Sequence, residues 1–210
     1  MKVLIACEYS GKVREAFRRR GHEAYSCDLL ESDDNSPHHY RGDCWEVIGL
    51  GWDLIIMHPP CTALAVSGNA HYGSGMKRHG ERLQAIEWTL ALYAHAKENA
   101  PQVAMENPVG VLPIKASQYV QPYQFGHPES KKTGLWLHNL PKLTPTNTLP
   151  RPDCGYWDNQ TPSGQNKLGP SADRWKIRSE TMLNRILYPA IGVLLGLITY
   201  TALIGLIWRI

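Results

Sequence analysis

Short apolar runs that end in polar or glycine-containing clusters divide the first half of the chain, and this alternation restricts the fold more than any other feature. Residues 3–7 and 52–57 are typical of buried strands. The segment after the first run places Val13, Ala16 and Phe17 on one face of a helix. Strands that alternate with helices form a mostly parallel sheet, so the sequence predicts an α/β domain of this kind.

The alternation continues further along the chain. Residues 81–99 carry apolar side chains at helical spacing, and a proline separates this predicted helix from a predicted strand at residues 102–105. The apolar positions of the helix are Leu83, Ile86, Leu90, Tyr93 and Ala94. Further strands are expected at residues 24–27 and 134–137. Between residues 110 and 180, proline, glycine, asparagine and threonine predict mainly irregular structure.

The chain has 210 residues, of which 43% are hydrophobic, so it is long enough for one domain and a short appendage. Its formal net charge of +3 permits binding to a polyanion without requiring it. The five cysteines are dispersed and form no Cys-x-x-Cys pair, so no metal site is expected. Reduced thiols, and an amino terminus without the features of a secretory leader, favour a cytoplasmic protein.

Cys61 stands just beyond a predicted strand, in the sequence His58-Pro59-Pro60-Cys61. Prolines cannot continue a strand ladder, so they end the strand and stiffen the backbone before the thiol. Residues 62–80 are rich in glycine, serine and alanine, which predicts a mobile loop that closes over a ligand. Position alone favours an inert buried thiol, but the residues at neighbouring strand ends favour a nucleophile.

Other polar residues follow predicted strands and are expected at the same edge of the sheet, where ligands bind in such folds. Glu106 follows one strand and could donate or accept a proton beside a substrate ring. Asp28 ends another, where a carboxylate can bond the ribose hydroxyls of a nucleoside-containing cofactor. Ser10 and Gly11 follow the first strand, where the backbone must approach such a cofactor closely.

Taken in order, these motifs resemble those of the cytosine-C5 DNA methyltransferases. The matching segments are Tyr9-Ser10-Gly11, Asp28, Gly42-Asp43, Pro59-Pro60-Cys61 and Glu106-Asn107-Pro108. The resemblance implies a Rossmann-like methyltransferase fold that uses S-adenosylmethionine as its cofactor. The residues that it implies for cofactor binding are Tyr9, Ser10, Gly11, Asp28, Asp43 and Pro59. It also implies that Cys61 is the catalytic nucleophile and that Glu106 and Asn107 complete the catalytic site.

The reaction implied by the resemblance is methyl transfer to C5 of cytosine in DNA. The Cys61 thiolate attacks C6 while Glu106 holds N3 and its proton, so C5 becomes nucleophilic enough to take the methyl group. Elimination then releases Cys61. A base in duplex DNA must be flipped out of the stack to reach either residue. The residues expected to contact the substrate are Pro60, Lys77, Arg78, Lys131 and Lys132.

More narrowly, the chain resembles small phage-encoded proteins related to these methyltransferases. Residues 121–128 and 131–140, together with Asp173-Arg174-Trp175, carry this likeness. It predicts one methyltransferase-like catalytic domain over residues 1–180, in which residues 110–180 form a reduced, irregular part that faces the substrate.

The sequence also departs from the family pattern. Val13 replaces the second glycine of the cofactor motif, and Pro108 replaces the valine after Glu106-Asn107. No Gln-x-Arg-x-Arg segment follows, and residues 111–180 are too few for the usual target-recognition domain. These differences predict altered cofactor binding and slight sequence specificity.

Residues 187–208 contain no charged side chain and are about as long as a membrane-spanning helix. Lys176, Arg178 and Arg185 precede them, as expected for the cytoplasmic flank of an anchor. A helix buried in a bundle or in a dimer interface can be equally apolar. The sequence therefore leaves a carboxy-terminal membrane anchor and a buried helix as alternatives.

Two other functions stay open on the sequence. A missing recognition domain matters less for a small substrate, so the same cysteine chemistry fits an enzyme that modifies free pyrimidine nucleotides. The other alternative is a catalytically degenerate relative that binds DNA or a host protein.

Overall fold

The computed structural model describes residues 1–163, which divide into two compact units. The first unit contains Met1–Val120 and Lys131–Leu140, and the second contains Gln121–Ser130 and residues 141–163. The segment at residues 187–208 lies outside the described residues, so both alternatives for it stay predictions. None of the helices within residues 1–163 combines the length and the apolar character needed to cross a membrane.

The first unit is built on a sheet that has seven strands within the described residues, in the order β3-β2-β1-β4-β5-β7-β6. Five strands run parallel: β1 (Lys2–Ala6), β2 (Glu23–Asp28), β3 (His39–Arg41), β4 (Leu54–Met57) and β5 (Gln102–Pro108). β7 (Thr133–His138) pairs antiparallel with β5 and with β6 (Gln118–Val120). The sheet is mostly parallel, as predicted, and its first five strands follow the order of Rossmann-like folds.

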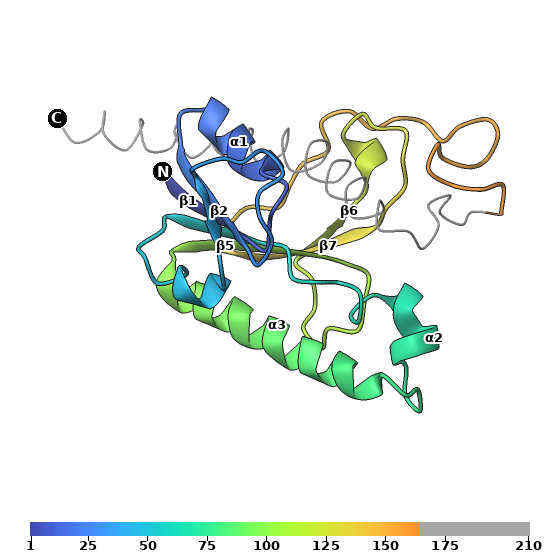
Figure 1. Ribbon diagram of the computed structural model, residues 1–210. Coiled ribbons are helices and arrows are strands. Elements are labelled where there is room, and N and C mark those ends of the chain that lie inside the picture. The colour runs from blue at the N-terminus through green and yellow to red at the C-terminus, as the bar shows by residue number, and fades with distance from the viewer. Residues whose placement is uncertain (164–210) are drawn as a thin grey trace. The chain divides into compact units, whose positions relative to one another are not determined.

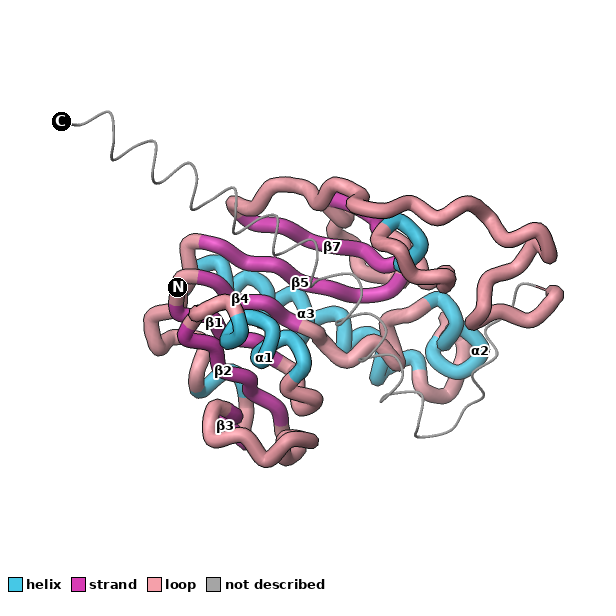
Figure 2. Tube along the Cα trace, turned by 90° about the horizontal axis from the view of Figure 1, so that it is seen from above, coloured by secondary structure: helices cyan, strands magenta, loops and turns pink. Residues whose placement is uncertain are grey.

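Helices cover both faces of this sheet. Figure 1 shows α1 (Lys12–Arg19) on one face and α3 (His79–Asn99) on the other, and Figure 2 shows the strands side by side between them. α1 buries Val13, Ala16 and Phe17, as the sequence predicts. The central strands are buried on both faces, which explains why β1 and β4 appear in the sequence as nearly continuous apolar runs.

The helix predicted at residues 81–99 is present as α3, but its buried face differs from the apolar positions in the sequence. The side chains that it buries are Arg82, Thr89, Leu92 and Ala96, whereas Leu83 is exposed. Arg82 can be buried because backbone and side-chain oxygens of a neighbouring loop accept hydrogen bonds from its guanidinium group. An apolar pattern alone could not identify this face.

Two strands have no signal in the sequence. β3 and β6 are three residues long, and most of their side chains are partly or fully exposed. Neither contains an apolar run, so each depends on its pairing with a longer neighbour, β2 or β7.

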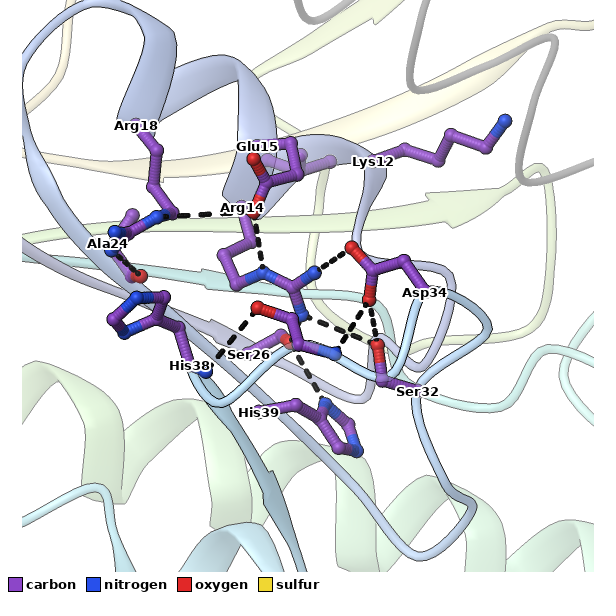
Figure 3. A network of polar contacts seen from close by, with 12 residues as sticks. Lys12, Arg14, Glu15, Arg18, Ala24, Ser26, Ser32, Asp34, His38 and His39 are labelled. Atoms are coloured by element: carbon purple, nitrogen blue, oxygen red, sulfur yellow. Dashed lines mark hydrogen bonds and ion pairs between the residues drawn. The ribbon is translucent and has the colours of Figure 1, made fainter.

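Arg14 is a fully buried cation at the junction of α1, β2 and the segment that follows β2, and Figure 3 shows its partners. Its Nη1 donates to Ser26 Oγ at 2.7 Å and to Ser32 Oγ at 3.4 Å, and its Nη2 donates to the Asp34 carboxylate. Burial raises the pKa of Asp34, but the hydrogen bonds from Ser32 and Arg14 outweigh burial and hold that pKa below its ordinary value. The charge of Arg14 is therefore matched by a carboxylate that is itself partly open to solvent.

The network extends from Arg14 to the segment between β2 and β3. Ser26 Oγ is hydrogen-bonded to His39 Nδ1 at 2.8 Å, and His39 Nε2 is bonded to the carbonyl oxygen of Leu30 at 2.9 Å. These bonds fix the chain directly after Asp28, at the carboxyl end of β2.

We predict that Arg14→Met lowers the free energy of unfolding by about 1–3 kcal/mol, because it leaves the buried hydroxyl groups of Ser26 and Ser32 without their guanidinium donor. Arg19→Met is the matched control, since Arg19 lies on the same helix with an exposed side chain, and it should change stability by less than about 0.5 kcal/mol. Urea denaturation measures both. Equal stability of the two variants would contradict the role assigned to Arg14.

Candidate active site

The carboxyl ends of β4 and β5 bring the predicted catalytic segments together. Met57 and Met105 are partners in the parallel register, so His58, which follows β4, lies beside Glu106. The sequence placed Glu106 after its strand, but Glu106 and Asn107 lie within β5, where they pair with Leu135 and Gly134 of β7. His58 Nδ1 lies 3.4 Å from Glu106 Oε2, and both side chains are about nine-tenths buried. The predicted meeting of the Pro-Pro-Cys segment with Glu106 is therefore present in the fold.

Hydrogen bonds continue between the two segments beyond the strands. Asn107 Nδ2 donates to the carbonyl oxygen of Pro59 at 2.9 Å, within the segment that leads to Cys61. Further along, Val111 N donates to Leu64 O at 3.0 Å and Val66 N donates to Val109 O at 3.2 Å. The chain around Cys61 is thus fastened to the chain after Glu106 on both sides of the thiol.

Gly110 allows this close approach. It pairs with Ala65 in an antiparallel bridge, and a Cβ atom at position 110 would lie 2.4 Å from the carbonyl oxygen of Leu64. That distance is far below van der Waals contact, and the obstacle is backbone, which cannot rotate away. Any side chain at this position would therefore push the two segments apart.

Arg82 holds the Cys61 segment from α3. Its Nε donates to Ala63 O at 2.7 Å, its Nη2 to Ala65 O at 3.3 Å, and its Nη1 to Asn69 Oδ1 at 2.8 Å. Planar donors in a fixed fork suit such a set of oxygens, which a lysine could not satisfy in the same way. Arg82 is a positioning residue for the Cys61 segment.

The segment after Cys61 has more regular structure than its composition predicts. The carbonyl oxygen of Cys61 accepts hydrogen bonds from the backbone N–H groups of Leu64 and Ala65, and the helices Val66–Gly68 and α2 (Asn69–Tyr72) follow. Together with the bonds from Arg82, these contacts hold residues 61–72 in place, and closure of the predicted loop at residues 62–80 over a ligand stays a prediction.

Unpartnered polar atoms gather at the same place. Within residues 1–163, the buried side-chain atoms without a hydrogen-bond partner are His58 Nε2, Glu106 Oε1 and Asn107 Oδ1. Each such atom costs about 1–3 kcal/mol, so native structures keep few of them, and those that persist call for an explanation. All three lie in the two segments that flank the nucleophile candidate, which marks this region as a site for a polar ligand.

Glu8 contributes a buried carboxylate close to these atoms. Its Oε1 accepts from Val13 N at 2.7 Å and its Oε2 from Arg14 N at 3.3 Å, so it caps α1 in place of a side chain at Gly11. Burial raises the pKa of Glu8 above its ordinary value, although the charge of His58 and the hydrogen bonds to the carboxylate favour ionisation. Nothing in the sequence selects Glu8 beyond its place directly after an apolar run.

A cavity of about 320 Å³ lies beyond the carboxyl ends of the first four strands. Its lining residues are Cys7, Cys27, Asp28, Leu29, Gly42, Asp43, Cys44, Pro60 and Trp88. Burial raises the pKa of Asp28, whose Oδ1 accepts a hydrogen bond from Leu30 N at 3.0 Å. An apolar cavity with two carboxylates at its wall has the composition of a small-molecule site.

The thiols of this cavity differ from Cys61 in their surroundings. A hydrogen bond with Cys44, and then burial, raises the pKa of Cys7 well above its ordinary value. Burial raises the pKa of Cys27 to about 12. Because the thiolate is the nucleophilic form, Cys7 and Cys27 are poor nucleophiles near neutral pH. Cys61, which is partly exposed, is better placed than either of them for nucleophilic attack.

Only some of the residues predicted to bind the cofactor line this cavity. Asp28 and Asp43 line the cavity, together with Pro60, which the sequence had placed with the substrate. The residues predicted to bind the cofactor that do not line it are Tyr9, Ser10, Gly11 and Pro59. Ser10 donates to Glu8 at 3.2 Å, and Gly11 has a φ of +69° with the Arg14 side chain directly beside it. The backbone conformation and the neighbouring Arg14 side chain therefore require glycine at position 11, whether or not a cofactor binds there. Contact of Gly11 with a cofactor stays a prediction.

The basic residues predicted to contact DNA are exposed or partly buried. Arg78 forms a two-bond ion pair with Glu81, at 2.8 and 2.7 Å, and lies over the Tyr72 ring. Lys132 Nζ lies 4.7 Å from the centre of the Tyr119 ring, and Lys77 is exposed. Lys131 is partly buried and engaged with a partner of its own. Contact of all four with DNA stays a prediction.

Comparison with known proteins identifies no family. No family model matches the sequence, and no curated protein matches it. Among solved structures, the chain is similar to the Entamoeba histolytica methyltransferase EhMeth, with a TM-score of 0.48 and 14% sequence identity. The similarity covers 70% of this chain, which spans 57% of that protein. The function of the site therefore has to be inferred from its own residues.

We predict that Gly110→Ala lowers the free energy of unfolding by about 1–3 kcal/mol, because the new methyl group overlaps the backbone at Leu64. Gly80→Ala is the matched control: Gly80 lies in α3 with no atom near its added Cβ, so alanine should raise stability by up to about 1 kcal/mol. Thermal and urea unfolding report the difference. A Gly110→Ala protein as stable as wild type would show that the two segments are not held together as described.

Proposed function

We propose that the protein is an S-adenosylmethionine-dependent methyltransferase that transfers a methyl group to C5 of cytosine in DNA. One observation carries the proposal. Pro60 lines the cavity together with Asp28 and Asp43, and the next residue is Cys61, whose segment is hydrogen-bonded to that of Glu106 and Asn107. The cavity and the segment of the nucleophile candidate thus adjoin at Pro60 and Cys61.

The cavity residues fit the cofactor by their chemistry. Asp28, at the end of β2, is placed to accept hydrogen bonds from ribose hydroxyl groups, as an acidic residue does in Rossmann-like folds. Asp43 can accept from an adenine amino group, and Leu29, Pro60 and Trp88 offer apolar contact. Bound S-adenosylmethionine supplies an electrophilic methyl group.

The catalytic residues fit a pyrimidine ring. Attack of the Cys61 thiolate on C6 creates a nucleophilic centre at C5 only if negative charge on the ring is neutralised, and protonation of N3 by Glu106 achieves this. The second carboxyl oxygen of Glu106 and the Asn107 Oδ1 atom lack partners in the protein. Both can accept hydrogen bonds from the amino group of a cytosine, which favours cytosine over a ring that presents a carbonyl there.

The proposal assigns DNA contacts to basic side chains near the site. Cys61 and Glu106 are reached only by a nucleotide flipped out of the duplex, which requires the protein to hold the backbone on either side. Lys77 and Lys132 are exposed and carry charges suited to phosphate contacts. Arg78 is available only in competition with its ion pair to Glu81.

Transfer of a labelled methyl group from S-adenosylmethionine to a cytosine-containing duplex, by the purified full-length chain, tests this function. Cys61→Ser should abolish transfer, and Glu106→Gln should lower it by about 10²–10⁴-fold, because the gain from a positioned proton donor is lost. Cys154→Ser is the matched control, since Cys154 is exposed and remote in sequence from the site, and it should keep wild-type activity.

The outcomes separate the alternatives. Label in dCMP but not in DNA would select modification of free nucleotides. Wild-type activity in Cys61→Ser would refute the covalent mechanism, and absence of any cofactor binding by calorimetry would favour a non-catalytic DNA- or protein-binding relative.

A further inference from the structure

Two acidic side chains flank one imidazole at this site. His58 begins the segment after β4, and its backbone N–H donates to Ala6 O at 3.0 Å, which fixes it beside β1. Its Nδ1 is 3.4 Å from Glu106 Oε2. On the β1 side, His58 is close enough to Glu8 for its charge to lower the pKa of that carboxyl. Within residues 1–163, the charged groups that face His58 are therefore Glu8, from the β1–α1 connection, and Glu106, from β5.

This arrangement provides a route for a proton between His58 and Glu106. The two groups are about nine-tenths buried, and a hydrogen bond in such surroundings is electrostatically stronger than in water. His58 Nε2 and Glu106 Oε1 are both buried without hydrogen-bond partners, so neither group is committed to a purely structural bond through those atoms. A structural histidine of the ordinary kind has both ring nitrogens satisfied.

We propose that His58 is a positioning residue that supplies the proton which Glu106 delivers to the pyrimidine ring, with Glu8 stabilising the protonated imidazole. This inference rests on the proposed methyltransferase function and extends it. It assigns a role to the histidine of the His58-Pro59-Pro60-Cys61 sequence and to the buried Glu8, neither of which takes part in the reaction as described so far.

Each proton in the reaction cycle has a donor and an acceptor. At the start, His58 and Glu106 share one proton through Nδ1 and Oε2. As the Cys61 sulfur bonds to C6, this proton passes through Glu106 to N3, leaving a neutral imidazole and a carboxylate. After methyl transfer, C5 loses its proton to solvent and the bond between sulfur and C6 breaks. N3 then returns its proton to the pair, so the relay is restored and one proton is released for each methyl group transferred.

A substitution that keeps the hydrogen bond to Glu106 but removes the transferable proton of His58 separates this role from a structural one. In His58→Asn, the amide nitrogen takes the place of Nδ1 and can still donate to Glu106, but it carries no transferable proton. We expect kcat to fall about 10–100-fold, within the range of general acid catalysis, with unchanged KM for S-adenosylmethionine.

The pH profile of kcat is the readout that a structural role would not move. In the wild type, kcat should fall at high pH, where the shared proton is lost. In His58→Asn the pH dependence of kcat should change, because the imidazole that supplies this proton is absent. A variant with the wild-type kcat and profile would refute the relay alone, whereas a wild type without methyl transfer would refute the proposed function and the relay with it.

A second measurement needs no substrate. In protein labelled with ¹⁵N at its nine histidines, the two ring signals of His58 are identified by their loss in His58→Asn. Glu106→Gln should shift chiefly the Nδ1 signal, and Glu8→Gln should change the protonation of the ring at a given pH. Ring signals that neither substitution changes would show that His58 does not share its proton with these carboxylates.

Discussion

Parallel pairing of β4 with β5, continued past the strand ends by side-chain and backbone hydrogen bonds, is the interaction on which the site depends. The strands alone place His58 beside Glu106, since Met57 and Met105 are register partners. The bond from Asn107 to Pro59 and the bridge between Ala65 and Gly110 carry the contact on to either side of Cys61. These bonds hold the backbone of the Cys61 segment against the chain that contains Glu106 and Asn107.

The buried charges of the first unit fall into two kinds. Arg14 and Arg82 have oxygen acceptors for their guanidinium groups, and they fasten the segments after β2 and after β4 respectively. Glu106 and His58 instead retain buried atoms without partners, next to the raised-pKa carboxyl of Glu8. A structure that satisfies its supporting charges but leaves these few atoms unsatisfied is typical of a site kept ready for a ligand.

The sequence predicted those strands and site residues that leave a local pattern along the chain. Buried runs identified β1, β4 and β5, and the rule that parallel strands place their carboxyl ends at one edge led to Cys61, Glu106 and Asp28. Asp43 was implied only by the resemblance of the ordered motifs to a known family. The sequence could not find β3 or β6, whose pairing depends on neighbours far along the chain, nor the buried face of α3, where Arg82 is stabilised by carbonyl oxygens of a distant loop. Glu8 and His58 were missed as partners because only the folded chain brings β1, β4 and β5 together.

The most direct test of the central claim is the mass of the protein after incubation with S-adenosylmethionine and a duplex that contains 5-fluorocytosine. Fluorine at C5 cannot leave as a proton does, so elimination fails and the enzyme stays bound to the base. The expected mass is that of the protein plus the oligonucleotide plus one methyl group, and the modified peptide should contain Cys61. No adduct, or attachment through Cys7, Cys27, Cys44 or Cys154, would contradict it.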